Sequence, residues 1–210
     1  MSTEPLFKIV FLAAFVVAAW SAASAARRAT ARHGSPTNQL QNEVRGLLVV
    51  RAVLGLVFYV ALGGWLSDWR REITDLHLPM SVRYAGIGLL AAGVLLINWG
   101  YRSLGANYRG GIGLYDQHEL ITDGAYRWLR HPIYAGFVLI MCAVTLLSSN
   151  WLLGLSGLLL VISIPAGRMR EEESQLRERF ADRWNAYRRR TGAFVPGRGS
   201  SARFGEDRET

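Results

Sequence analysis

The residues of this chain that could bind a polar ligand gather at one junction, where the polar, glycine-containing segment 118–131 meets an unbroken apolar run. Pro132 suits the first position of a helix, because that position leaves its N–H unpaired in any case and the fixed φ of proline already fits the helix. The free N–H groups that follow then face Arg130 and His131, and such a helix end attracts anions. Together with Tyr134, the junction offers a guanidinium, an imidazole and a phenol to an anionic ligand.

A simpler interpretation of the same residues is structural. Arg130 and His131 would mark the membrane surface, and Tyr134 would be one of the aromatic side chains that line both interfaces of a bilayer. This structural interpretation is favoured as long as the junction is considered alone. A binding site therefore requires support from other segments of the chain.

A second group of charged residues lies near the C-terminus. Arg168 and Glu172 are i,i+4 neighbours at one edge of a predicted apolar helix face, and Glu173 falls within that face. A carboxylate on an apolar face needs a partner, but an exposed pair at this spacing contributes only a few tenths of a kcal/mol to stability. Spacing alone therefore favours an ordinary surface pair over a site.

The composition indicates a membrane protein with charged connections between its spans. Half of the 210 residues are hydrophobic and the mean hydropathy is +0.15, yet 24 Lys and Arg stand against 16 Asp and Glu. A pI near 10.2 is also typical of nucleic-acid-binding proteins. The arginines here, however, flank apolar runs or lie in one C-terminal helix, and they form no basic patch with interleaved aromatic residues. We therefore expect no nucleic-acid partner.

The cysteine content excludes an internal disulfide. Cys142 is the only cysteine, and it lies inside an apolar run. The histidines and this cysteine do not show the spacing of a zinc site. We therefore expect no metal centre.

Two apolar segments in the N-terminal half are long enough to cross a hydrocarbon core, which takes about 20 residues. The first covers 6–26 and ends in Ser-Ala-Ala-Ser-Ala-Ala, a sequence similar to a signal-peptidase site. The positive charge of Arg27 and Arg28 resists translocation and favours a retained helix. The second covers 46–66, and Arg51 in its first turns is expected to snorkel to the surface rather than to face the bundle interior.

The second half of the chain carries three further apolar segments. A third span over about 84–101 is followed by the connection 102–130, which is too long for a plain turn between bundle helices and is typical of a functional loop. The segments 132–150 and 151–164 are then predicted to form two short antiparallel helices, the second ending at Pro165. Both are short for a straight crossing, so tilt or partial burial is expected.

From Gly167 the pattern changes to a highly charged helix with an apolar face. The apolar face carries Met169, Leu176, Phe180 and Tyr187, with Trp184 beside them. Such a helix lies against the membrane or against the protein. Residues 197–210 have little to bury and are expected to be disordered, so that 1–196 form a single integral-membrane domain.

These segments predict an all-α, multi-pass membrane protein with about five transmembrane helices and a C-terminal amphipathic helix. Segment 27–45 has a net charge of +3 from four arginines and one glutamate. With five spans it lies on the same side as 102–130 and the basic C-terminal helix, whereas the electrically neutral loop 67–83 lies on the other side. By the positive-inside rule the basic side is cytoplasmic.

Two segments together resemble the signature of a known family. The run LGANYRGGIGLYDQHELITDGAYRWLRHPIYAG and the later run EESQLRERFADRWNAYRRRTGAFVP are similar to segments of the isoprenylcysteine carboxyl methyltransferases, membrane enzymes that use S-adenosylmethionine. They cover roughly 101–136 and 168–196, in the family's order, with a short helical hairpin between them. Ala181 and Trp184 are departures, since glycine and tyrosine are commoner at those positions.

The resemblance implies a cofactor-binding core over 101–196 and roles for individual residues. The residues that fall where the family binds its cofactor are His118, Glu119, Leu120, Ile121, Tyr126, His131, Pro132, Ile133, Tyr134 and Glu172. Arg168, four residues before Glu172, matches the family's substrate-side arginine and is the expected catalytic residue. The triplet 171–173 leaves open whether Glu172 or Glu173 is the cofactor contact.

The function that the resemblance implies is methyl transfer from S-adenosylmethionine to the carboxylate of a membrane-embedded, lipid-like acceptor. Two other functions remain open: a phospholipid headgroup N-methyltransferase, which the same cofactor motif would serve, and a nicotinamide-dependent membrane reductase of the sterol type. An amine acceptor would require a base to remove its proton, whereas a carboxylate is already ionised at neutral pH. The expected partner is a lipid or lipidated small molecule, with the active site facing the cytoplasm.

Overall fold

The structure is a computed structural model that describes residues 3–33, 45–69, 71–108 and 119–197. These residues form α-helices and short 3-10 helices, and within the described ranges there is no β-strand, only two isolated bridges. In chain order the elements are α1 (Glu4–His33), α2 (Arg45–Leu66), α3 (Arg71–Thr74), α4 (Met80–Leu104), η2 (Gly105–Asn107), η3 (Gly124–Arg127), α5 (Pro132–Ser148) and α6 (Trp151–Arg190). The prediction of an all-α architecture is confirmed.

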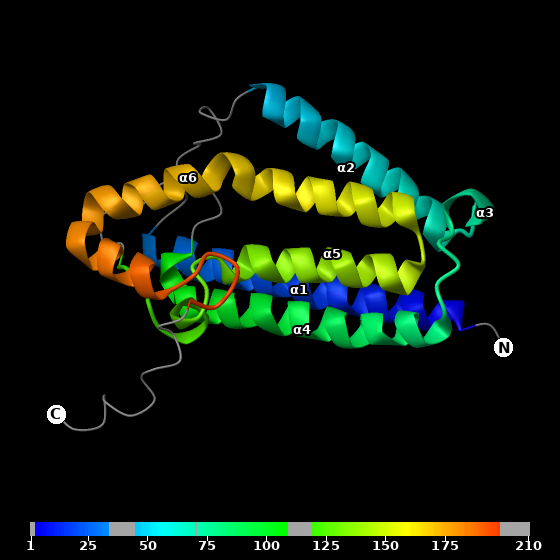
Figure 1. The fold of residues 1–210 in the computed structure, drawn as a ribbon, viewed down its shortest axis with the longest axis horizontal. Coiled ribbons are helices and arrows are strands. Elements are labelled where there is room, and N and C mark those ends of the chain that lie inside the picture. Colours follow the sequence, from blue (N-terminus) through cyan, green and yellow to red (C-terminus); the bar gives the residue numbers. More distant parts are fainter. Residues whose placement is uncertain (1–2, 34–44, 70, 109–118, 198–210) are drawn as a thin grey trace.

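Four of the described helices, α1, α2, α4 and α6, are long and apolar enough to cross a membrane, and α5 is a shorter apolar helix. The chain is an integral, multi-pass membrane protein, as the sequence predicts. In Figure 1, α1, α4 and α5 lie side by side, α6 runs along α5, and α2 packs on α6. The apolar, membrane-spanning part of α6 ends before Arg168, and the remainder of the helix is highly charged.

The segments that carry the candidate site lie at one end of the bundle (Figure 1). The C-terminal ends of α1 and α4, the start of α5 and the charged part of α6 gather there, and α3 and the start of α1 lie at the opposite end. This is the arrangement expected from consecutive antiparallel crossings. The tail predicted over 197–210 lies outside the described residues, apart from Gly197.

Glycines seven residues apart on α4 set its close packing against α5. A Cβ atom at Gly93 would lie 2.8 Å from Cγ1 of Ile140 and 3.0 Å from the carbonyl oxygen of Gly136. A Cβ atom at Gly100 would lie 2.8 Å from Cγ1 of Ile133. Small residues let helix backbones approach closely where lipid provides no hydrophobic drive. α4 therefore fixes the position of the first turn of α5.

At the end opposite to the candidate site, α1 is tied to the bundle by a buried charge. Arg83 of α4 is 4% exposed, donates through Nε to the carbonyl oxygen of Leu147 at 3.0 Å, and pairs with the carboxylate of Glu4. Its guanidinium also lies over the ring of Phe7, 4.3 Å from the centroid. Because a buried charge without a partner is strongly destabilising, Arg83 holds α1, α4 and α5 together.

The C-terminal helix differs from the prediction. The sequence predicts a break at Pro165, but α6 continues through it as far as Arg190. Proline removes one helix hydrogen bond and disturbs its neighbours, and in a membrane an adjacent helix can supply donors instead. Nη2 of Arg51 on α2 donates to the carbonyl oxygens of Ser163 and Ile164 at 2.8 and 3.2 Å. The prediction that Arg51 snorkels is therefore also wrong, because its guanidinium faces α6.

α6 bends further on, at Ala181. This residue has φ 41° and ψ −110°, which interrupts the helical geometry. A φ in this range favours glycine, so alanine here carries local strain. Beyond the bend, the last part of α6 returns toward the start of α5, where the hydroxyl of Tyr187 meets the carbonyl oxygen of Tyr126.

Candidate active site

The start of α5 supplies the open helix end on which the predicted site is built. α5 begins at Pro132, which confirms the prediction, and His131 before it has φ −127° and ψ 58°. The N–H of Ala135 donates to the carbonyl oxygen of His131 at 3.1 Å, so this amide belongs to the helix and is not free for a ligand. The amides at the open end are those of Ile133 and Tyr134.

The segment after α6 pairs with the residues before α5. The N–H of Arg130 donates to the carbonyl oxygen of Gly192 at 2.8 Å, and the N–H of His131 donates to that of Ala193 at 3.1 Å. The ring of Phe194 lies 6.0 Å from the ring of His131. Residues 191–194 therefore form one wall of the site. The sequence does not predict this role, although these residues lie in the second of the two resembling runs.

Glu173 lies between two basic side chains of this junction. Its Oε1 atom accepts from Nε of Arg130 at 3.1 Å and lies 3.2 Å from Nε2 of His131. The hydrogen bond with His131, together with the charge of Arg130, holds the pKa of Glu173 below its ordinary value, although partial burial acts in the opposite sense. Nη1 of Arg130 also donates to the carbonyl oxygen of Thr191 at 2.8 Å. Glu173 is thus an ionised partner inside a structural cluster.

Glu172, the neighbouring residue, has a different environment. Its Oε1 atom accepts from the hydroxyl of Tyr134 at 3.0 Å, and the rings of Tyr134 and His131 stack with centroids 5.7 Å apart. Burial raises the pKa of Glu172, and the charge of His131, the bond from Tyr134 and the charge of Arg168 oppose that rise.

The hydrogen-bonding capacity of Glu172 is only partly used. An ionised carboxylate offers about four acceptor positions, and within the described part of the chain Tyr134 is the one hydrogen-bond donor to Glu172. Arg168 lies one helical turn earlier, on the same side of α6, and is half-buried like Glu172. The pair therefore presents a carboxylate and a guanidinium to the same side of the helix.

The end of α6 covers the connection between α4 and α5. The hydroxyl of Tyr187 donates to the carbonyl oxygen of Tyr126 at 2.7 Å, and Tyr187 is 2% exposed. Burial raises the pKa of Tyr126, and the charges of Tyr187 and Glu172 add to the effect. Where η3 meets the end of α4, the N–H of Ala125 donates to Oγ of Ser103 at 3.0 Å. Tyr126 is thereby held within electrostatic reach of Glu172.

The predicted site residues fall into three groups in the structure. Those that lie together around the start of α5 are Tyr126, His131, Pro132, Ile133, Tyr134, Arg168 and Glu172. Leu120 and Ile121 precede η3, as does Glu119, which is exposed and whose N–H donates to Oδ1 of Asn107 at 3.2 Å. His118 lies outside the described residues. The structure adds the segment 191–194 to the cluster, and it shows that Arg130, which the sequence places at this junction, is paired with Glu173.

An open apolar groove runs from Tyr134 between α5 and α6. Its volume is about 870 Å³, which is within the range of cavities that bind small molecules. The groove extends from Leu139 and Ile162, within the apolar part of the bundle, to Tyr134 and Arg170, its polar lining residues. The polar cluster and the apolar groove therefore meet at Tyr134.

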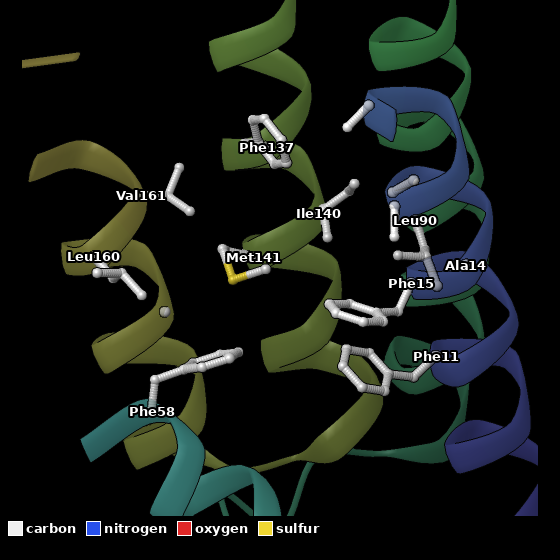
Figure 2. Close-up of a pocket in the computed structure, with 14 residues that line it drawn as sticks. Phe11, Ala14, Phe15, Phe58, Leu90, Phe137, Ile140, Met141, Leu160 and Val161 are labelled. Carbon is white, nitrogen blue, oxygen red and sulfur yellow. The ribbon is translucent and has the colours of Figure 1, made fainter. Parts of the chain in front are cut away.

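A smaller cavity of about 250 Å³ lies between α1, α2, α4, α5 and α6. Figure 2 shows side chains of these helices around it, among them Phe11, Phe58, Phe137 and Met141. All of its lining residues are apolar, so it offers no group for catalysis. Among the described residues there is also no group of three or more His, Cys, Asp or Glu side chains arranged to hold a metal ion.

The fold and the site define a class: an all-helical integral membrane protein whose polar site lies at one end of the bundle and opens into an apolar groove. The fold is similar to a solved structure of the eukaryotic intramembrane Ras methyltransferase, isoprenylcysteine carboxyl methyltransferase, with a TM-score of 0.54 at 20% sequence identity. The match covers 78% of this chain and 55% of that one. At this identity the likeness shows the fold alone.

Sequence comparison finds similarity to the same family over part of the chain. Residues 86–178 match the model of the isoprenylcysteine carboxyl methyltransferase family. Proteins named protein-S-isoprenylcysteine O-methyltransferase from Schizosaccharomyces pombe and Homo sapiens are each 32% identical to this chain, over 79 and 81 residues. These matches cover 38% and 39% of this chain but only 34% and 28% of the relatives' length. The chain is therefore similar to the isoprenylcysteine carboxyl methyltransferase family over less than half of its length, and it matches about a third of each of these relatives.

Proposed function

We propose that this protein transfers a methyl group from S-adenosylmethionine to the carboxylate of a lipid-like acceptor embedded in the membrane. The observation that carries the proposal is the position of Glu172, a half-buried carboxylate with Tyr134 as its one donor among the described residues, beside the open end of α5 and at the head of an apolar groove. The names of the relatives describe the same chemistry on an isoprenylated cysteine. An amphiphile of that class, with one carboxylate and one apolar chain, suits the polar cluster and the groove together.

The polar cluster suits the charges of S-adenosylmethionine. This molecule carries an ammonium and two hydroxyl groups, which are donors for a carboxylate such as Glu172. It also carries a carboxylate, which suits the open amides of α5 and the imidazole of His131. When bound, it supplies a methyl group attached to a positively charged sulfur. After transfer of the methyl group, this sulfur remains in a neutral thioether. The role of the protein is to bind and orient the two reactants, because the rate of an in-line displacement increases most when they are held in a near-attack geometry in a water-poor site.

In this mechanism Arg168 orients the acceptor carboxylate, and no general base is needed. A carboxylate is ionised at neutral pH, so it attacks the methyl carbon without first losing a proton. The planar fork of a guanidinium matches a carboxylate at two points. The groove beside Tyr134 holds the apolar part of the acceptor along α5 and α6. An amine acceptor would instead need a base, and the charge of Arg168 would repel its ammonium form.

Calorimetry on detergent-purified protein tests the cofactor part of the proposal at Glu172. Loss of a buried, charge-assisted hydrogen bond costs roughly 1.5–3 kcal/mol, about tenfold or more in affinity. Glu172→Ala should weaken binding of S-adenosylmethionine by that factor, whereas Glu171→Ala, at an exposed neighbour, should leave it unchanged. Full affinity in Glu172→Ala with weakened binding in Glu173→Ala would assign the contact to Glu173. Binding of a nicotinamide cofactor in place of S-adenosylmethionine would favour a reductase.

A further inference from the structure

The polar end of the groove is marked by Arg170. Five residues of α6 line the groove and share one helix face: Ile162, Pro165, Ala166, Met169 and Arg170. Arg170 is the last of them and is exposed. It lies eight residues after Ile162, which corresponds to about 12 Å along the helix at a rise of 1.5 Å per residue. Along α6 the groove is therefore lined by apolar residues until it ends at the cationic side chain of Arg170.

No residue in the described part of the chain neutralises the guanidinium of Arg170. Glu173 is three residues further along α6 and is therefore its neighbour on the helix surface. That carboxylate is held by Arg130 and His131 instead. Among the described residues Arg170 has no hydrogen bond or ion pair. A positive charge at the head of an apolar groove is thus left without a partner among the described residues.

Arg168 and Arg170 occupy different positions relative to the groove. They are two residues apart, or about 200° around the helix. Their side chains therefore project from nearly opposite sides of α6. Arg168 lies on the same side of α6 as Glu172, and its charge acts on that carboxylate. Arg170 lines the groove itself. The two cations therefore lie beside different features, Arg170 at the groove and Arg168 at the polar cluster.

We propose that Arg170 determines acceptor specificity by binding the anionic head of an amphiphile whose apolar chain lies in the groove, before that head reaches Arg168. This inference rests on the proposed methyl transfer to a carboxylate. Transfer forms a C–O bond to the carboxylate and breaks the S–CH₃ bond, so the product is a neutral ester. Arg170 therefore favours the acid over the ester and aids the exchange of product for substrate.

Equilibrium binding separates this role from a structural one. The probes are N-acetyl-S-farnesylcysteine, which has one free carboxylate, and its methyl ester, measured on protein in nanodiscs of phosphatidylcholine. Wild type should bind the acid about three- to fivefold more tightly than the ester, the range of a solvent-exposed ion pair. Arg170→Gln should lower this ratio toward one without changing the affinity for the ester, and Arg170→Lys should retain most of it.

Arg177→Gln is the matched control, because Arg177 is exposed, lies two turns further on nearly the same side of α6 and does not line the groove. It should keep the wild-type ratio. In methyl-transfer assays Arg170→Gln should raise KM for the acid by the same factor and leave kcat unchanged.

Three results would overturn the role of Arg170: an unchanged acid-to-ester ratio in Arg170→Gln, equal weakening of both ligands, or a fall in kcat at constant KM. Absence of methyl transfer to any carboxylate by wild type would instead contradict the proposed function. The binding ratio would still decide the role of Arg170 in that case.

Discussion

At the scale of single residues, Glu172 and Glu173 occupy one turn of α6 but have opposite environments. Glu173 is surrounded by Arg130 and His131, whereas Glu172 is buried with the hydroxyl of Tyr134 as its donor. Adjacent residues on a helix point about 100° apart, and both directions here reach the start of α5. The sequence could not choose between them, because the choice depends on partners that lie about 40 residues away in the chain.

Glu173→Gln should lower the thermal stability of the protein in detergent at neutral pH. Folding lowers the pKa of Glu173 from its ordinary value of 4.5. Such a carboxyl contributes stability above its unfolded pKa and loses that contribution as the pH falls through its folded pKa. The difference in melting temperature between wild type and variant should therefore be full at neutral pH and narrow below pH 4.5.

Glu172→Gln is the comparison for this pH series. Burial raises the pKa of Glu172, so its charged form opposes folding at neutral pH, and the neutral variant should be at least as stable as wild type. If the difference in melting temperature between wild type and Glu173→Gln grew as the pH was lowered, the assigned role of Glu173 would be contradicted. A larger loss of stability in Glu172→Gln than in Glu173→Gln would contradict it as well.

Arg168→Ala should lower the rate of methyl transfer and leave the affinity for S-adenosylmethionine nearly intact. The reason is that Arg168 orients the acceptor in the proposed mechanism, whereas Glu172 contacts the cofactor. Arg168→Lys should restore the rate only in part, because a lysine lacks the planar two-point fork. Initial rates and calorimetry on the same preparations give both quantities, and Arg177→Ala is the control. Equal rates in Arg168→Ala and Arg177→Ala would reject the special role.

At the scale of elements, α4 positions the site through its glycines, and Gly93→Ala should destabilise the protein. The added Cβ would meet Ile140 and the backbone of Gly136 at 2.8 and 3.0 Å, and overpacking of this kind costs typically 1–3 kcal/mol. Gly88→Ala, on the same helix with nothing within 4 Å of the added Cβ, should be neutral or stabilising. Melting temperatures in detergent compare the two variants, and equal losses would show that close α4–α5 contact is not what stabilises this pair.

The sequence predicts where α5 begins, but it does not predict the path of α6. Pro132 at the first helical position is a local signal, and the structure confirms it. Pro165 is an equally local signal for a helix end, but α6 continues through it, and Arg51 of α2 donates to the carbonyl oxygens of Ser163 and Ile164 beside it. The pairing of Arg130 with Gly192 is also non-local, and backbone hydrogen bonds leave no side-chain pattern in the sequence.

At the scale of the whole molecule, apolar length and charge predict the number and order of the crossings. They do so because the thickness of the bilayer and the solvation of charge act on each segment separately. The groove between α5 and α6 could not be predicted in this way, since it depends on how two helices pack over their length. The same holds for the contact between the end of α6 and the connection before α5.

The topology predicts which end of the bundle faces the cytoplasm. Thr30, at the end of α1 that lies with the site, and Ser67, beyond α2, are both exposed and lie at opposite ends. In a Cys142→Ala background, Ser67→Cys should react with an impermeant maleimide in intact cells. Thr30→Cys should react only after permeabilisation, because the positive-inside rule predicts that the site end faces the cytoplasm. Labelling of Thr30→Cys in intact cells would reverse the orientation and remove the site from the cytosolic pool of S-adenosylmethionine.

Methyl transfer to a carboxylate gives an ester, and the chemical stability of the product distinguishes an ester from an N-methyl group. Purified wild type is incubated with tritiated S-adenosylmethionine and N-acetyl-S-farnesylcysteine or fractionated membrane lipids, and the product is treated with mild base. A methyl ester releases its label as volatile methanol, whereas an N-methyl group is retained. The account predicts base-labile label in wild type, strongly reduced in Arg168→Ala and in Glu172→Ala. Label that stays in a phospholipid fraction after base treatment, or no transfer to any acceptor, would contradict it.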